Sequence, residues 1–253
     1  MAFSLPRIAV ILALLLGGAP VQAQELSLSL GGDGTLSGNT VQLILLLTIL
    51  SLAPGIAVMV TCFPFIITVM SILRQAIGLQ QSPPNMMLVS LALFLTYFIM
   101  DPVFTAAWSA GVRPLTEGAL PLDEAFVRGI EPFRIFMAAR VDPETLNHLL
   151  ALRPDALPRG DPQGADPQGD LSETALSVLI PAFMLSEISR AFEIGFIIFL
   201  PFLVIDLVVA AVLMSMGMMM VPPAIVALPF KLAFFVVADG WTLLSTALVQ
   251  GYV

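Results

Sequence analysis

The chain has 253 residues, of which 58% are hydrophobic and 11% are charged, and its formal net charge is −8. Because soluble domains carry about 25% charged residues, this composition excludes an ordinary soluble globular protein and predicts an integral membrane protein or membrane-embedded assembly. Together with the segments described below, it leads us to predict an all-α, membrane-associated fold. The negative charge excludes nucleic-acid binding, which requires clustered Lys and Arg. With a single cysteine, Cys62, and a single histidine, His148, the chain offers no internal disulfide, no metal site and no cofactor motif.

The beginning of the chain has the pattern of a signal peptide. Arg7 precedes a short apolar run at residues 8–16, and Val21-Gln22-Ala23 is a small-residue cleavage site. The apolar run is too short to span a bilayer, so we predict that residues 1–23 are cleaved and leave an extracytoplasmic N-terminus. Residues 24–39 are rich in Gly and Ser and predict a flexible lead-in.

Residues 40–109 predict a first helical hairpin region. Its uncharged beginning is too long for one span, so Pro54-Gly55 and Pro64 are predicted to bend or break the helix. The uncharged part of the second helix, residues 86–100, ends at Asp101-Pro102 after about 22 Å.

Residues 110–177 predict a polar extracytoplasmic region. The repeats at residues 161–164 and 166–169, both Asp-Pro-Gln-Gly, predict a disordered linker rather than a folded module. Before this linker, residues 122–137 predict one or two amphipathic helices, because apolar side chains recur there at helical spacing.

Residues 178–253 predict a second helical region with two interruptions. The first is a methionine loop, in which Met214, Met216 and Met218–Met220 precede Pro222-Pro223, a pair that cannot continue a helix. Flexible thioethers adapt to many surfaces, which favours a soft plug or gasket; a short turn whose methionines fill gaps is the alternative. Pro229, Lys231 and Asp239 mark the second interruption.

The positive-inside rule orients these segments. With the N-terminus outside, Arg74 lies in a cytoplasmic loop, residues 110–177 return outside, the methionine loop faces the cytoplasm and the C-terminus lies outside.

A charged side chain at the centre of a bilayer costs about 2.5–3.5 kcal/mol on the mildest scale. Charged residues within or beside apolar segments therefore need partners. Glu187 and Arg190 share one helix face, which suits presentation as a pair. Lys231 and Asp239 lie about 12 Å apart along one helix and cannot pair directly. Two interpretations stay open, a charged transport route and salt bridges between subunits. The charged residues that lie within or beside apolar segments are Asp101, Glu187, Arg190, Glu193, Asp206, Lys231 and Asp239.

Several long motifs resemble the FliP family of flagellar biosynthetic proteins. They occupy most of residues 40–105 and 178–245. In chain order they are Leu-Arg-Gln-Ala-Ile-Gly at 73–78 with Pro-Pro-Asn at 83–85, Leu-Ala-Leu-Phe-Leu-Thr at 91–96, Pro-Ala-Phe at 181–183 with Ser-Glu at 186–187, Ala-Phe-Glu-Ile-Gly-Phe at 191–196, Pro-Phe-Leu-Val-Ile-Asp-Leu at 201–207, Gly-Met-Met-Met-Val-Pro-Pro at 217–223, Leu-Pro-Phe-Lys at 228–231 and Asp-Gly-Trp at 239–241.

The resemblance implies a core subunit of the flagellar type III export gate. Such subunits form a ring of several copies with FliQ and FliR, and the ring passes unfolded flagellar proteins outward. It implies the bacterial inner membrane at the flagellar basal body, contact with lipid and other export components, no enzymatic activity, and rings that can sit raised from the bilayer. It maps a pore gasket onto Met218, Met219 and Met220, a subunit contact onto Glu187, and a family phenylalanine onto Phe136, next to Arg134.

The chain departs from the family pattern after Phe136-Met137. Relatives often carry Gln-Thr-Arg-Glu there, and Arg140 is the candidate to replace their arginine. Two rival functions are a small-solute or ion transporter with a charge relay through Lys231 and Asp239, and an intramembrane aspartyl hydrolase that uses Asp206 and Asp239. The chain has no zinc-protease, serine-hydrolase or nucleotide-binding motif.

Overall fold

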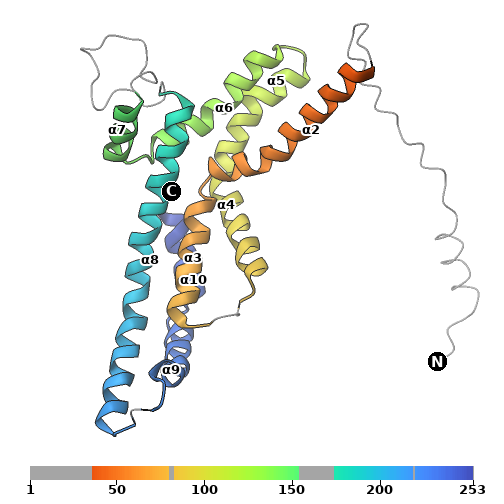
Figure 1. The fold of residues 1–253 in the computed structure, drawn as a ribbon. Helices are drawn as coiled ribbons and strands as arrows, with labels where there is room; N and C mark the ends of the chain where they lie inside the picture. Colours follow the sequence, from red (N-terminus) through yellow and green to blue (C-terminus); the bar gives the residue numbers. More distant parts are fainter. Residues whose placement is uncertain (1–35, 80–82, 154–173, 219, 253) are drawn as a thin grey trace, which may run out of the picture. The chain divides into compact units, whose positions relative to one another are not determined.

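The computed structural model describes residues 36–79, 83–153, 174–218 and 220–252, and the regular structure in these ranges is helical (Figure 1). This confirms the predicted all-α class for the described part. The chain divides into two units, Met1–Thr48 and Ile49–Val253. The predicted signal peptide and the Asp-Pro-Gln-Gly repeats lie outside the described residues.

The first unit contributes the beginning of helix α2 (Leu36–Met59). This helix starts within the predicted lead-in and continues through Pro54-Gly55 without a break in its helical assignment. The chain instead breaks at residues 60–62, and helix α3 (Phe63–Ile77) begins there with a proline in its first turn. Pro64 therefore starts a helix, a position that suits a residue with preset φ and no N–H.

In the second unit, α3 is the central helix. Its apolar residues recur at helical spacing, and Ile66, Val69 and Met70 are completely buried. Helix α8 (Leu176–Ser215) packs along α3, and α4 (Asn85–Ala107) packs against another side of it (Figure 1). Gly195 on α8 makes room for Ile72, whose Cδ1 would lie 2.4 Å from a Cβ at that position.

The second helix is longer than predicted. Helix α4 passes through Asp101-Pro102 and continues as a π-helical turn, η1 (Trp108–Val112), and as α5 (Arg113–Thr116). The helix continues through Asp101-Pro102 because the exposed carboxylate stays outside the packed face and one proline removes only one N–H from the helix. The predicted boundary between residues 109 and 110 falls inside this helical run.

After α5, the described part of the polar region forms two further packed helices. The predicted amphipathic helix is confirmed as α6 (Leu122–Ala138). It is followed by α7 (Pro143–Leu152), which Asp142 caps by accepting from the Thr145 N–H at 2.8 Å. His148 is exposed on α7. Both helices pack against α8, so residues up to 152 belong to the folded unit.

The long apolar stretch after residue 176 is one unbroken helix, α8, of 40 residues. Helices α9 (Pro223–Val237) and α10 (Gly240–Gln250) follow and are bent by 61° relative to each other. Asp239 lies at this bend and adopts the left-handed φ of 48°. Two helical runs in the described part are long and apolar enough to cross a membrane, or three if α9 and α10 count as one span.

The closest helix crossing depends on Gly111 in η1. A Cβ there would lie 2.5 Å from the Ala125 carbonyl oxygen and 2.8 Å from the Gly129 Cα, both backbone atoms of α6. We therefore expect Gly111→Ala to force η1 and α6 apart and to lower the free energy of unfolding by about 1–3 kcal/mol. The effect is measured by heating the protein in detergent and recording the loss of its monodisperse chromatographic peak.

Gly129→Ala is the matched control, because a Cβ at Gly129 would meet its nearest atom at an ordinary 3.8 Å. Equal unfolding midpoints for the two variants would contradict this close backbone approach.

Candidate functional site

The methionine loop joins α8 to α9 through an ordered helix end. Gly217 has φ 74°, its N–H donates to the Met214 carbonyl at 3.1 Å, and the Met218 N–H donates to the Leu213 carbonyl at 3.0 Å. This pair of bonds is the Schellman pattern, which ends a helix at a left-handed glycine. Pro222 then caps α9, and Pro223 occupies its first turn. The predicted loop position is confirmed.

The described methionines of this loop face away from the core. Met214 and Met216 are 61% and 63% exposed, and Met218 and Met220 are 40% and 97% exposed. These exposures favour side chains that are open to a partner over the alternative of a turn whose methionines fill gaps. Met219 lies outside the described residues.

Lys231 holds α9 to both neighbouring helices. Its Nζ lies 2.6 Å from Asp206 Oδ2 on α8 and donates to the Ala76 carbonyl on α3 at 2.9 Å. Only 7% of the Lys231 side chain is exposed. The second carboxylate oxygen of Asp206 is buried and has no hydrogen-bond partner in the described part of the chain. The partner of Lys231, left open by the sequence, is thus Asp206.

Asp239 does not share this pair. It is exposed at the α9–α10 bend and accepts a hydrogen bond from the Thr242 hydroxyl at 3.2 Å. Asp206 and Asp239 thus take different partners, an ammonium and a hydroxyl. This geometry does not favour an aspartyl pair in which Asp206 and Asp239 share a proton.

Glu187 is the most deeply buried charge. Its residue exposure is 0%, one oxygen lies 2.9 Å from Arg140 Nε, and the other accepts from the Tyr252 hydroxyl. The predicted Glu187–Arg190 pair is wrong, because Glu187 turns into the core and Arg190, three residues on, is exposed. Arg140 does provide the arginine that the family pattern led us to look for.

Arg140 and Tyr252 also contact each other. The Arg140 guanidinium carbon lies 3.7 Å from the centroid of the Tyr252 ring, and its Nη1 donates to the Gly251 carbonyl at 3.1 Å. Burial, and then the negative charge of Glu187, raise the pKa of the Tyr252 phenol far above its usual range. Tyr252 therefore stays neutral and serves as a hydrogen-bond donor.

Two aromatic residues complete this cluster. Phe136 stacks on Tyr252 with ring centroids 6.2 Å apart, and Phe183 lies edge-on to Phe136 at 5.8 Å. Arg134 lies near the C-terminal end of α6 and donates to the Thr174 carbonyl at 2.8 Å. Arg134 and Phe136, predicted as a subunit contact or a buried charge, make these contacts within the chain. Sequence reasoning missed Tyr252 as a member of this cluster.

Cys62 lies beside the same cluster and is completely buried. Burial raises the pKa of its thiol to about 12, and the nearby Glu187 charge adds to the rise, although a hydrogen bond with Thr96 opposes it. The thiol is therefore unreactive in the folded chain. Among the residues that the structure describes, no three His, Cys, Asp or Glu side chains gather as metal ligands.

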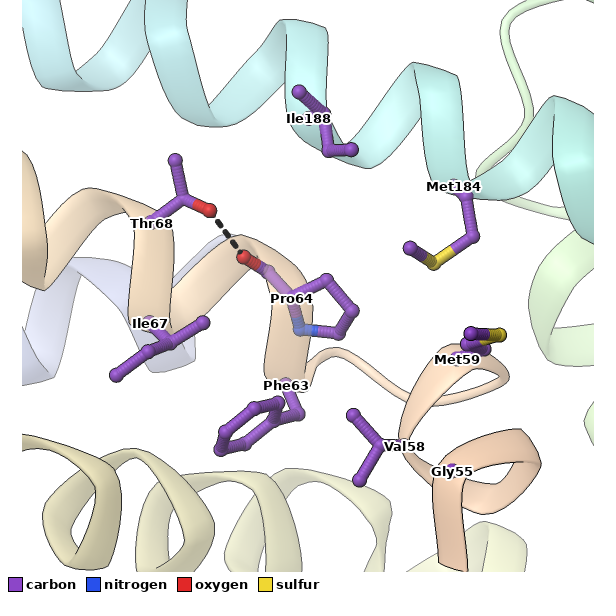
Figure 2. A pocket seen from close by; sticks show the side chains of 9 residues that line it. All are labelled: Gly55, Val58, Met59, Phe63, Pro64, Ile67, Thr68, Met184 and Ile188. Atoms are coloured by element: carbon purple, nitrogen blue, oxygen red, sulfur yellow. Dashed lines mark hydrogen bonds between the residues drawn. The ribbon is translucent and has the colours of Figure 1, made fainter. Parts of the chain in front are cut away.

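An apolar pocket of about 560 Å³ lies between the end of α2, the start of α3 and α8 (Figure 2). Met59 and Met184 approach it from α2 and α8, and the hydroxyl of Thr68 is occupied because it donates to the Pro64 carbonyl at 2.7 Å. No charged side chain lines the pocket, so it suits apolar contact and offers nothing to hold a polar solute.

The comparisons with known proteins agree on one family. The FliP family model matches residues 46–248. The chain is 48% identical to the flagellar biosynthetic protein FliP of Caulobacter vibrioides over 97% of this chain and 88% of that relative. It is 47% identical to the FliP of Agrobacterium fabrum over 87% and 86%, and 44% identical to the FliP of Bacillus subtilis over 85% and 92%.

The buried Arg140–Glu187 pair yields a test of the site. Arg140→Met leaves a buried carboxylate without its cation, and we expect a loss of about 3–5 kcal/mol in unfolding free energy. Combining Arg140→Met with Glu187→Leu removes both charges and should restore much of that loss. Thermal unfolding of the purified chain measures all variants.

Arg113→Met is the control, because the Arg113–Glu117 pair is exposed by 66% and 57% and should contribute at most about 1 kcal/mol. A double variant no more stable than Arg140→Met alone would show that the pair is not the source of the effect.

Proposed function

This chain belongs to the FliP family of flagellar biosynthetic proteins and is a membrane-embedded component of the flagellar export apparatus, and from that premise we propose that it forms the pore of the export gate. Unfolded flagellar proteins would pass through this pore. The observation that supports the proposal is the methionine loop, whose described thioethers at Met214, Met216, Met218 and Met220 are exposed at a helix end.

The chemistry of the loop suits a seal. Methionine is unbranched and polarizable, so its side chain repacks against surfaces of different shape at low cost. A seal around an unfolded chain must accept many sequences, and flexible methionine surfaces are typical of such promiscuous contacts. Met218, Met219 and Met220 would close the resting pore, and Gly217 would let the loop move at the end of a rigid α8.

The exposed apolar faces support assembly with other subunits. Helix α4 exposes Phe94, Tyr97 and Phe98 by 61–65%, and α8 exposes Phe192 and Phe196. These faces can be covered by lipid or by neighbouring apolar helices. The proposed partners are further copies of the chain in a ring, FliQ and FliR, and other export components.

The proposed location follows from the same premise. The chain would lie in the bacterial inner membrane at the flagellar basal body, with an extracytoplasmic N-terminus after removal of residues 1–23. It would act without catalysis, and the energy for export would come from its partners. The transporter alternative is disfavoured because Lys231 is bound to Asp206 and the Ala76 carbonyl, away from the exposed Asp239.

Replacing Met218, Met219 and Met220 together by alanine tests the proposed seal. Because alanine removes the thioethers but keeps the backbone, we expect the assembled gate to form and to leak ions. The leak is measured in cells as growth arrest that depends on the ions in the medium. It is measured in vesicles that carry the purified gate as ion flux.

Met86→Ala with Met87→Ala is the matched control, since these methionines are 76% and 65% exposed but lie at the start of α4. A correctly assembled triple variant that stays as tight as this control would refute the gasket.

A further inference from the structure

The C-terminal arm of the chain is short and weakly built on its own. Helix α10 has 11 residues, a length at which an isolated helix is marginal in water. Its core-facing residues are Leu244 and Leu248, while Leu243 on the same helix is 67% exposed. Something must hold each end of α10 in place.

The N-terminal end of α10 is braced by Phe235 of α9. The Phe235 ring lies edge-on to Trp241 at 5.4 Å, and a Cβ on Gly240 would lie 2.1 Å from that ring. This contact secures the corner between the two helices but does not reach the end of the chain.

The C-terminal end of α10 is held by the residues that follow it. Tyr252 inserts its ring between elements that are distant in sequence, edge-on to Phe65 of α3 at 5.4 Å and stacked on Phe136 of α6. Its hydroxyl donates to Glu187 of α8. The Gly251 carbonyl accepts from Arg140, so the backbone and the side chain of the C-terminus bind the same ion pair.

Through these contacts the C-terminus interacts with the buried carboxylate of Glu187, which needs hydrogen-bond donors from the protein. Glu187 is fully buried and has two partners, of which Tyr252 is one, and Arg140 faces the Tyr252 ring. Withdrawal of Tyr252 would remove a donor from a buried carboxylate and an aromatic face from the guanidinium. The ion pair and the end of α10 therefore stabilise each other.

We propose that Gly251-Tyr252 is a C-terminal latch. Tyr252 is its positioning residue, because it holds the end of α10 against the Arg140–Glu187 pair. The latch ties the last helix to the turn between α6 and α7. This inference concerns the folded chain itself and goes beyond its role in the gate, so its test does not depend on export.

Hydrogen–deuterium exchange of the full-length protein in detergent, read by mass spectrometry, tests the latch. With Tyr252→Ala, amides at residues 246–252 and at the α6–α7 turn, residues 139–142, should exchange at least about tenfold faster. Amides of α9 near Lys231 should keep their protection, because Asp206 and the Ala76 carbonyl hold that helix independently.

Tyr252→Phe is the milder variant and serves if the alanine variant does not fold. It keeps the ring contacts and loses the bond to Glu187, so exchange at residues 139–142 should rise while residues 246–252 change less. Tyr97→Ala is the matched control, because Tyr97 is 62% exposed and should leave both segments unchanged.

Three results would overturn the latch. One is unchanged exchange at residues 246–252 and 139–142 in a folded Tyr252→Ala variant. Another is unchanged exchange at 139–142 in Tyr252→Phe. The third is loss of protection in α9 to the same extent as in α10, which would mean that the arm opens as a whole rather than at its end.

Discussion

A carboxylate without access to water must find its hydrogen-bond donors inside the protein, and Glu187 sets this requirement for the helices around it. Arg140 comes from the end of α6 and Tyr252 from the C-terminus, so satisfying one charge draws together segments from three parts of the chain. The aromatic rings of Phe65, Phe136 and Phe183 then pack around the hydrogen-bonded core of the cluster. The positions of α3, α6, α8 and the end of the chain depend on that interaction.

A second ion pair, between the buried Lys231 and the partly exposed Asp206, connects helices farther along α8. Lys231 joins α9 to α3 and α8, so the helices on either side of the methionine loop are held on a common scaffold. The loop itself contributes little to this scaffold, since its described thioethers are exposed. The chain thus combines rigid helices, held by charges that cannot easily separate, with a connection whose side chains are free to change their packing.

The features readable from the sequence were those with a local physical cause. Periodic apolar residues predicted α6, and Pro222-Pro223 predicted that the preceding helix ends before them, whereas Pro64, predicted as a place to bend or break, lies in the first turn of α3. The sequence did not reveal how α4 continues past Pro102, because packing outweighs a local helix-breaking preference. It pointed to Arg140 through the family pattern but missed Tyr252 as a partner of Glu187, since Tyr252 lies 65 residues away and only the fold brings them together.

The burial of Cys62 has a practical consequence for studying such a protein. The sole thiol of the chain lies at the junction of α2 and α3, has no exposed surface and resists ionisation. Maleimide reagents require an accessible thiolate, so a cysteine introduced at an exposed position would be the one that reacts in the folded state. Spin labels, fluorophores and cross-linkers can therefore be placed one at a time in the natural background, without first replacing a residue that packs in the core.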